Sequence, residues 1–222
     1  LILAEDSYNK IYSVKGKSVT TVLNLPENDS FKDFIKTDRV ENGVFYIGGV
    51  SNERGLDITI KALHILKKRK ISFFMHYIGA ISNSTLSKIN INGIEDNIKF
   101  YGRMDLMKGY GVSKKCKVGL AVLKPTANYV ESYPTKIFEY MSVKLPVITS
   151  NFPLYQAVVE RHNVGFCIDP FSAEELADKI EILLMDDSLV KTMGENGIKA
   201  VLDQFNSKHE EIKLFNIYKK VL

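Results

Sequence analysis

The sequence predicts a doubly wound α/β domain, in which a parallel, Rossmann-like sheet is covered by helices on both faces. Short β-rich runs alternate with helical stretches along residues 43–205, and this alternation is typical of parallel strands joined by right-handed crossovers. Most of the runs are apolar nearly throughout, as expected of strands covered on both faces. Ligands of such sheets bind beyond the carboxyl ends of the strands, so functional residues are expected in the loops that follow them.

The expected elements follow one another along this region. Strands are expected at Val44–Ile47, Phe73–Ile78, Ile98–Phe100, Val118–Val122, Pro146–Thr149 and Gly165–Ile168. Helices are expected at Ile58–Lys68, Asp105–Lys115, Thr135–Val143, Leu154–Arg161, Ala173–Met185 and Leu189–Leu202. Ser172 and Glu175 have the spacing of a capping box, which sets the start of the helix that follows Ser172.

Both ends of the chain depart from this alternation. Leu1–Ala4 and Val19–Leu23 could be strands, with one or two helical turns at Ser7–Tyr12 between them, and the polar run 24–30 has the chemistry of a linker. Ser207–Leu222 is expected to be a charged amphipathic helix with the apolar members Ile212, Phe215, Ile217, Tyr218 and Val221.

Composition limits the class of protein. Of the 222 residues, 45% are apolar and 25% are charged, which are ordinary values for a globular domain and argue against disorder. The net charge of +4 is small and spread along the chain, so it does not indicate binding to nucleic acid. No apolar run approaches the roughly 20 residues of a membrane span. Cys116 and Cys167 are expected to be buried thiols of a reducing compartment, with a disulfide as the less favoured alternative.

The most informative segment is a loop and the helix that follows it. Pro134 suits the first turn of that helix. Lys136, Glu139 and Tyr140 then share one face by their spacing, and Glu131 lies in the loop before them. Two carboxylates, a lysine and the backbone N–H groups of a helix N-terminus form a suitable place for a diphosphate. An ordinary amphipathic helix with solvated charges explains the pattern about equally well.

A second segment places Gly48 and Gly49 at the end of a strand and Arg54 just before the next helix. Glycines let the backbone approach a ligand closely, and a guanidinium can hold two phosphate oxygens at once. The alternative is a tight strand-to-helix turn with a surface arginine. The segment is not the dinucleotide-binding fingerprint, because the third glycine and its spacing are absent.

With their surroundings, these two segments resemble the retaining glycosyltransferases of the GT-B fold, family 4. The resemblance rests on Glu131 and Glu139 with seven residues between them, on Pro-Thr-Lys-Ile-Phe-Glu-Tyr-Met around the second glutamate, and on Leu-Pro-Val-Ile after it. Further matching segments occur in the family's order: Gly48 to Gly55, Ile78-Gly79, Phe100-Tyr-Gly102-Arg103, Val164-Gly165-Phe166, and the run from Leu-Leu-Met-Asp-Asp to Met-Gly-Glu-Asn.

The resemblance implies a role for each of these residues. Glu139 would hold the ribose hydroxyls of a nucleotide sugar, and Glu131, as one of the catalytic residues, would approach the donor sugar and its diphosphate. Gly102 and Arg103 match the loop that meets the base through backbone contacts.

The resemblance also implies how the diphosphate is held. Arg54 matches the second basic residue of the family's pyrophosphate clamp, but Gly49 stands where the first basic residue is usually found. Diphosphate binding would therefore rely on Arg54, on Lys136, and on backbone amides near Gly48 and Thr135. Arg54 and Lys136 are expected to act catalytically, because cations placed there would stabilise the charge that builds on the departing diphosphate.

No metal ion or other cofactor is expected. Members of the family generally need no metal for this step. His64, His76, His162 and His209 are scattered without the spacing of metal ligands, and each is expected to be packed or solvated.

The resemblance divides the chain into four parts. Residues 1–24 would be the remnant of an N-terminal acceptor domain, 25–42 a linker, 43–205 the nucleotide-sugar-binding C-terminal domain, and 206–222 a helix that crosses back toward the N-terminal domain. The chain opens without Met in a strand-like run, so it is expected to be a piece of a longer protein. Alone, this donor-binding half would be inactive, with the apolar side of its last helix partly exposed.

The expected function is transfer of a sugar, with retention, from a UDP- or GDP-linked donor to a glycan or lipid-linked acceptor. The acceptor would bind through the missing domain, and no nucleic-acid partner is expected. The expected location is the cytoplasm, with peripheral contact at the inner face of the membrane as an option. Two alternatives stay open: an epimerase-like GT-B protein that uses nucleotide sugars, and a doubly wound binding module without catalysis.

Overall fold

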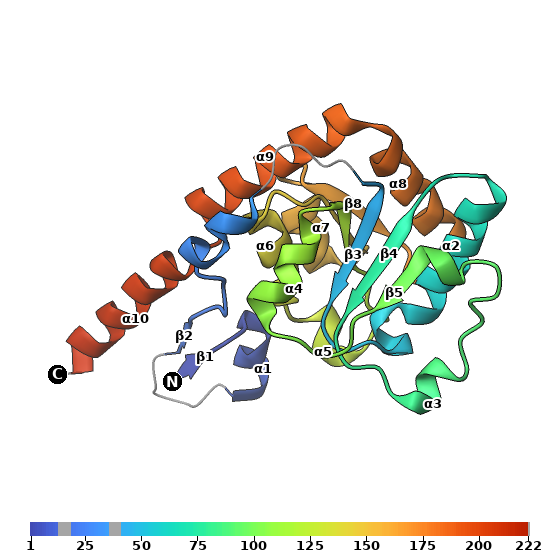
Figure 1. Ribbon diagram of the computed structural model, residues 1–222. Coiled ribbons are helices and arrows are strands. Elements are labelled where there is room, and N and C mark those ends of the chain that lie inside the picture. The colour runs from blue at the N-terminus through green and yellow to red at the C-terminus, as the bar shows by residue number, and fades with distance from the viewer. Residues whose placement is uncertain (13–18, 36–40, 222) are drawn as a thin grey trace.

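A six-stranded parallel sheet lies at the centre of the computed structural model, which describes residues 1–12, 19–35 and 41–221 (Figure 1). Its strands are β3 (Gly43–Ile47), β4 (Phe74–Ile78), β5 (Ile98–Phe100), β6 (Cys116–Ala121), β7 (Val147–Ser150) and β8 (Gly165–Ile168). They are ordered β5-β4-β3-β6-β7-β8, and all neighbouring pairs are parallel. The predicted doubly wound fold is confirmed, and its winding reverses between β3 and β6.

Helices cover both faces of the sheet. On one face, α2 (Leu56–Lys68) packs against α8 (Ala173–Met185). The other face carries α4 (Leu106–Ser113), α6 (Thr135–Ser142) and α7 (Pro153–Val159), and α9 (Asp187–Asp203) contacts both α6 and α8. Val44 and Phe45 belong to the two opposite apolar cores, because successive strand residues point to opposite faces.

The predicted strands and helices of residues 43–205 are all present, with ends shifted by at most two residues. Two local predictions need correction. Pro134 lies one residue before α6 and not in its first turn. Ser172 caps α8 by accepting a hydrogen bond from the Glu175 N–H, but the Glu175 carboxylate accepts from the N–H of Asp169, so only half of the predicted capping box forms.

Several short elements were not predicted. They are the helices α3 (Asn83–Leu86) and α5 (Ala127–Val130) and the 3-10 helices η2 (Asn28–Phe34), η3 (Asn52–Arg54) and η4 (Glu95–Asn97). Of these, η2 falls inside the predicted linker 25–42, where Leu25 and Phe31 are buried in the core that α4 and α6 line. Residues 36–40 of that linker lie outside the described residues.

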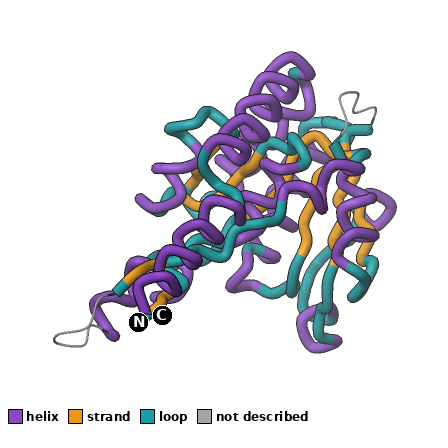
Figure 2. The backbone as a smooth tube through the Cα atoms, turned by 90° about the vertical axis from the view of Figure 1, so that its left-hand side faces the viewer, coloured by secondary structure: helices purple, strands orange, loops and turns teal. Residues whose placement is uncertain are grey.

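The N-terminal residues form a small unit of their own. The strands β1 (Ile2–Leu3) and β2 (Thr20–Thr21) pair in parallel, and η1 (Asp6–Tyr8) and α1 (Asn9–Tyr12) follow β1. This agrees with the expected strands and helical turns, apart from residues 13–18, which the structure does not describe. The pair β1–β2 is separate from the six-stranded sheet and lies near α10 in both views (Figures 1 and 2).

The last helix, α10 (Ser207–Val221), projects away from the sheet (Figure 1). Its start is held to the segment after β2, since Ser207 N donates to Pro26 O and the buried Glu210 carboxylate accepts from Leu23 N at 2.9 Å. As predicted, its apolar side is exposed: Ile212, Phe215 and Tyr218 are 58%, 65% and 56% exposed. The side chain of Val221 lies outside the described residues.

Other sequence predictions concern the cysteines and the membrane. Both cysteines are free thiols, as predicted; Cys116 is buried, whereas Cys167, also expected to be buried, is only partly so. None of the helices described here is both long enough and apolar enough to cross a membrane.

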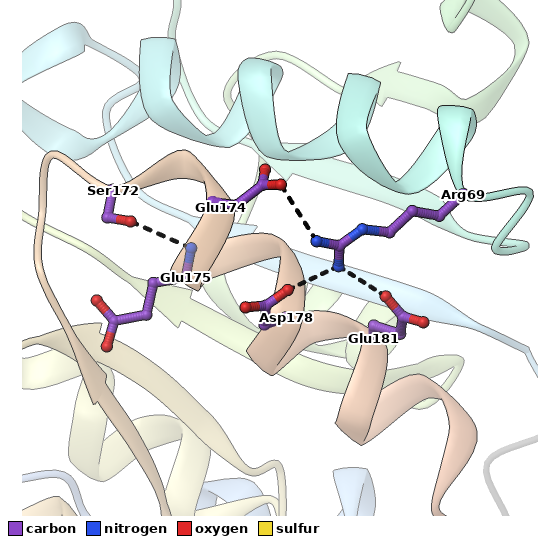
Figure 3. A network of polar contacts seen from close by, with 6 residues as sticks. All are labelled: Arg69, Ser172, Glu174, Glu175, Asp178 and Glu181. Carbon is purple, nitrogen blue, oxygen red and sulfur yellow. Dashed lines mark hydrogen bonds and ion pairs between the residues drawn. The ribbon is translucent and has the colours of Figure 1, made fainter.

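Two polar clusters connect elements that are distant in sequence. One joins the end of α2 to α8, and the other joins β6 to the end of α8 and the start of α9. Arg69, just after α2, reaches three carboxylates of α8 (Figure 3), with distances of 2.7 Å to Asp178, 2.8 Å to Glu181 and 3.4 Å to Glu174. This cluster is open to solvent, where ion pairs contribute little.

The cluster around Lys117 of β6 is different, because the Lys117 side chain is only 8% exposed. Its Nζ donates to Leu184 O at 2.8 Å and lies 2.6 Å from an Asp187 carboxylate oxygen.

Replacing Lys117 by methionine is expected to lower the free energy of unfolding by about 1–3 kcal/mol, because the buried Leu184 carbonyl loses its charged donor. Urea denaturation measures the change. The matched control is Arg69→Met, whose solvent-exposed ion pairs should be worth less. Equal losses for the two variants would contradict this interpretation of Lys117.

Candidate functional site

The candidate site lies at the carboxyl ends of β3 and β6, where the winding of the sheet reverses. Gly48 and Gly49 follow β3 directly, Arg54 ends η3, and Lys136 is in the first turn of α6. An ideal Cβ built on Gly48 would lie 3.2 Å from Lys136 Nζ and 3.6 Å from Arg54 Nη1. The structure therefore brings the glycine turn and both predicted cations together at the position where ligands of doubly wound sheets bind.

Two hollows lie near the glycine turn, and its glycines line the second of them. One, of about 220 Å³, is lined by Arg54 and Lys136, by Thr135 at the start of α6, and by the tyrosines Tyr129, Tyr133 and Tyr155. The second, of about 330 Å³, is mostly apolar and is lined by Gly48, Gly49, Gly79, Arg103, Met104 and Leu106. A larger hollow of about 460 Å³ beside α2 and α3 contains none of the predicted site residues.

Lys136 is the most unusual residue of the site. It is 8% exposed, and in the described part of the chain its Nζ has no hydrogen-bond partner. The ammonium lies over the ring of Tyr46, 4.1 Å from the centroid. Burial and, after it, the neighbouring Arg54 charge lower the pKa of Lys136 to about 7, although Glu139 opposes the shift. Near neutral pH this residue therefore gains or loses its proton readily, and an arriving anion would favour the charged form.

Arg54 keeps its charge in the same surroundings. Its guanidinium carbon lies 5.9 Å from the centre of the Tyr129 ring. Burial works against the charge, but interactions with the Tyr129 and Tyr46 side chains outweigh it and raise the pKa of Arg54 above its ordinary value. The site therefore combines one permanent cation with one that titrates.

Glu139 lies one turn further along α6 and lines neither hollow of the glycine turn. Its Oε2 accepts a hydrogen bond of 2.6 Å from the hydroxyl of Tyr110 in α4, which fixes the carboxylate. Tyr140, on the same predicted face, is a core residue: its hydroxyl accepts from Ile47 N and donates to Leu120 O, both at 3.2 Å. Tyr140 therefore packs in the core and does not face a ligand.

The remaining predicted residues lie apart from the cation pair. The side chain of Glu131, just after α5, is 50% exposed and pairs with Lys10 at 3.6 Å. Gly102, with a positive φ of +70°, accepts a hydrogen bond of 2.9 Å from Gly79 N. Arg103 reaches the apolar hollow. The structure thus groups Arg54, Thr135 and Lys136 in one hollow and Gly48, Gly49 and Arg103 in the other.

Sequence reasoning missed Tyr46, Tyr110 and Tyr129. Tyr46 directly precedes Ile47 and the glycine pair, so its position near the turn was readable, but its contact with Lys136 was not. Tyr110 and Tyr129 carry no local signal, because their contacts with Glu139 and Arg54 depend on the packing of helices distant in sequence.

The described residues contain no group of three or more His, Cys, Asp or Glu side chains that could bind a metal ion together. Two of the histidines have packing partners of their own: His64 contacts Asn90 O at 2.9 Å, and His76 contacts the Tyr101 hydroxyl at 3.0 Å.

Comparison with known proteins identifies the family. Residues 27–200 match the family described as glycosyl transferases group 1. A curated relative, the capsular polysaccharide biosynthesis glycosyltransferase CapM of Staphylococcus aureus, is 24% identical, and the match covers 79% of this chain and 46% of the relative. The chain thus spans less than half of that relative's length.

Solved structures of the GT-B type share the fold. HepE of Anabaena, in a complex with UDP, matches with a TM-score of 0.80 and 16% identity, over 99% of this chain and 63% of HepE. The C-terminal domain of LpcC, a glycosyl transferase group 1 family protein of Francisella tularensis, matches with a TM-score of 0.66 and 19% identity, over 82% of this chain and 98% of that domain. With the sheet order, the position of the glycine turn and the match over residues 27–200, this chain belongs to the group 1 glycosyl transferases.

Proposed function

We propose that this chain is the donor-binding, C-terminal half of a retaining glycosyltransferase of family 4, which transfers a sugar from a nucleotide-diphosphate sugar. The observation that carries the proposal is the convergence of Arg54 and Lys136 on the Gly48 turn, with a buried ammonium that has no hydrogen-bond partner among the described residues. Such a pair suits a diphosphate, whose charge rises as its bond to the sugar breaks.

The proposed roles follow from this arrangement. Arg54 and Lys136 hold the diphosphate and stabilise it as it leaves, and the backbone at Gly48, Gly49 and Thr135 approaches its oxygens. This way of holding the diphosphate needs no metal ion.

The residues outside the cation pair would bind the rest of the donor. Glu139, held by Tyr110, binds the ribose hydroxyls, while Arg103, at the apolar hollow, and the preceding Gly102 meet the base. Glu131 would approach the donor sugar, which requires its contact with Lys10 to break.

The donor base and the acceptor are proposed more broadly. UDP and GDP donors are both considered, and UDP is the first to test because HepE is similar in fold and was solved with UDP. The acceptor would be a glycan or lipid-linked glycan, bound through an N-terminal domain beyond this chain, and CapM is a relative that acts in capsular polysaccharide biosynthesis. The proposed location is the cytoplasm, with peripheral contact at the inner face of the membrane.

Thermal unfolding of the chain with a panel of UDP- and GDP-sugars tests the proposal. At least one compound is expected to raise the midpoint, because a ligand that binds only the folded state stabilises it. Glu139→Ala should weaken binding of that compound by about 1–3 kcal/mol, the loss typical of a hydrogen bond to a charged group. No stabilisation by any compound, or the same shift in Glu139→Ala, would contradict the proposal. Product analysis with the full-length protein separates transfer from epimerisation.

A further inference from the structure

Tyr46 is buried below the glycine turn of the donor site. It is the penultimate residue of β3, only 3% exposed, with its ring 5.6 Å from that of Tyr77 on β4. Buried tyrosine hydroxyls usually find a hydrogen-bond partner. Here the hydroxyl donates to the Gly49 carbonyl oxygen at 2.6 Å, so the partner belongs to the loop that follows the residue's own strand.

Three hydrogen bonds set the conformation of that loop. Gly48 N donates to Ile78 O at 2.8 Å and Val50 N donates to Ala80 O at 2.9 Å, which ties both sides of the turn to the end of β4. The Tyr46 hydroxyl donates to the Gly49 carbonyl, which lies in the chain between these two N–H groups. Because the peptide unit is planar, a fixed Gly49 carbonyl also fixes the plane of the bond to Val50. Gly48 itself has a φ of +131°, a conformation that few residues other than glycine adopt.

The ring of Tyr46 supports Lys136. The distance of 4.1 Å between Lys136 Nζ and the ring centroid lies within the range of a cation–π interaction. A ring face attracts the ammonium without accepting its N–H groups as an oxygen atom would, so these donors stay available for an anion. The charged groups that act on the ammonium from the surrounding elements are Arg54 of η3 and Glu139 of α6.

Arg54 also contacts this tyrosine, since its guanidinium interacts with the Tyr46 hydroxyl. Burial raises the pKa of Tyr46 to about 12, although the Arg54 charge opposes the shift. The hydroxyl therefore keeps its proton at neutral pH and remains a donor to Gly49. One side chain thus touches the glycine turn and both cations.

We propose that Tyr46 is a positioning residue for the diphosphate of the donor: its hydroxyl sets the Gly48–Gly49 turn, and its ring sets the Lys136 ammonium beside that turn. The inference rests on the proposed donor site and adds a residue that contacts its parts without contacting the diphosphate itself. The hydroxyl and the ring act on different partners, so two substitutions separate them. Tyr46→Phe removes only the hydroxyl, and Tyr46→Leu removes both.

The test measures binding of UDP and of uridine by calorimetric titration, or of GDP and guanosine if the wild type binds GDP more tightly. Tyr46→Phe is expected to weaken UDP binding about threefold to tenfold, the effect of one hydrogen bond, and to leave uridine binding unchanged. Tyr46→Leu should weaken UDP binding by a further factor of about three or more, through loss of the cation–π contact. The matched control is Tyr77→Phe, which removes a buried hydroxyl from the neighbouring strand and should change neither affinity.

The difference between UDP and uridine distinguishes positioning from general loosening of the fold. Equal losses for both compounds in Tyr46→Phe, or wild-type affinity for UDP in that variant, would overturn the inference while leaving the donor site in place. Absence of UDP and GDP binding in the wild type would instead overturn the proposed function, and this inference with it. If Tyr46→Leu fails to fold, Tyr46→Phe decides the question alone, because it keeps the shape of the ring.

Discussion

Lys136→Met is expected to weaken binding of the nucleotide sugar by about 2–4 kcal/mol at pH 6, a factor of roughly 30 to 1,000. The cost of truncating a buried partner of a charge pair is of this size, because the opposite charge is left without its counterpart. The wild-type ammonium is buried, lies beside Arg54 and has no hydrogen-bond partner in the described residues. A bound diphosphate would place an opposite charge directly beside it. Calorimetric titration of the variant and the wild type measures the loss.

The same substitution should leave the free energy of unfolding unchanged or raise it. A buried cation without a hydrogen-bond partner is costly, and methionine fills a similar volume without that cost. With the pKa of Lys136 near 7 in the folded chain and its ordinary value of 10.5 in the unfolded chain, the unfolded state binds more protons between these pH values. The contribution of Lys136 to wild-type stability therefore becomes more favourable as pH rises through this window, and the variant should lack that slope.

Binding of the nucleotide sugar should depend on pH, because Lys136 changes its protonation when the diphosphate binds. The diphosphate raises the pKa of Lys136, so the empty site must take up a proton above pH 7 and the affinity falls by up to about tenfold per pH unit. A nucleotide sugar is the right probe, because each of its two phosphate groups carries one ester and one anhydride bond and has no ionisation near pH 7. Titration at pH 8 in two buffers with different enthalpies of ionisation should show proton uptake in the wild type. Lys136→Arg, whose guanidinium stays charged, should bind without that uptake, and uptake retained in Lys136→Met would assign it to another group.

The sheet could be predicted because each strand is marked by its own residues and by those directly after it. The run Val44–Ile47 is buried on both faces, so it lacks polar alternation, and the glycines after it end the strand where the chain must turn. The 3-10 helix Asn28–Phe34 was missed for the opposite reason. Its composition is polar, and the burial of Phe31 depends on α4 and α6, which lie much later in the chain.

The sequence predicts which residues form the donor site, but not which of their side chains contact one another. Arg54 and Lys136 were both expected at a diphosphate, and the structure places them together. Sequence spacing could not show that Tyr46 contacts both the glycine turn and Lys136, because these contacts depend on how α6 packs against the sheet. Nor could spacing show that the turn α5 directs Glu131 toward Lys10 rather than toward the cations.

Arg54→Glu is expected to weaken UDP binding by at least about 3 kcal/mol, more than a hundredfold, because it replaces a cation beside the diphosphate with a like charge. Uridine, which has no phosphate, should lose less than about 0.5 kcal/mol, as for a substitution outside its contacts. Calorimetric titration or competition against a bound nucleotide measures both affinities. A matching loss for UDP and uridine would remove Arg54 from the diphosphate and assign it to the general integrity of the site.

The uncharged position at Gly49 allows the reverse experiment. Among the described residues, one heavy atom, Arg54 Nη1 at 4.0 Å, lies within 4 Å of an ideal Cβ on Gly49, so there is room for a longer side chain beside the first cation. Adding Gly49→Arg to Arg54→Ala should therefore restore part of the UDP affinity that Arg54→Ala loses, since a second guanidinium would reach the same oxygens. Uridine binding should stay the same in both variants. If Gly49→Arg restores nothing while the double variant stays folded, the diphosphate lies out of reach of a side chain at position 49, and Lys136 and the start of α6 hold it instead.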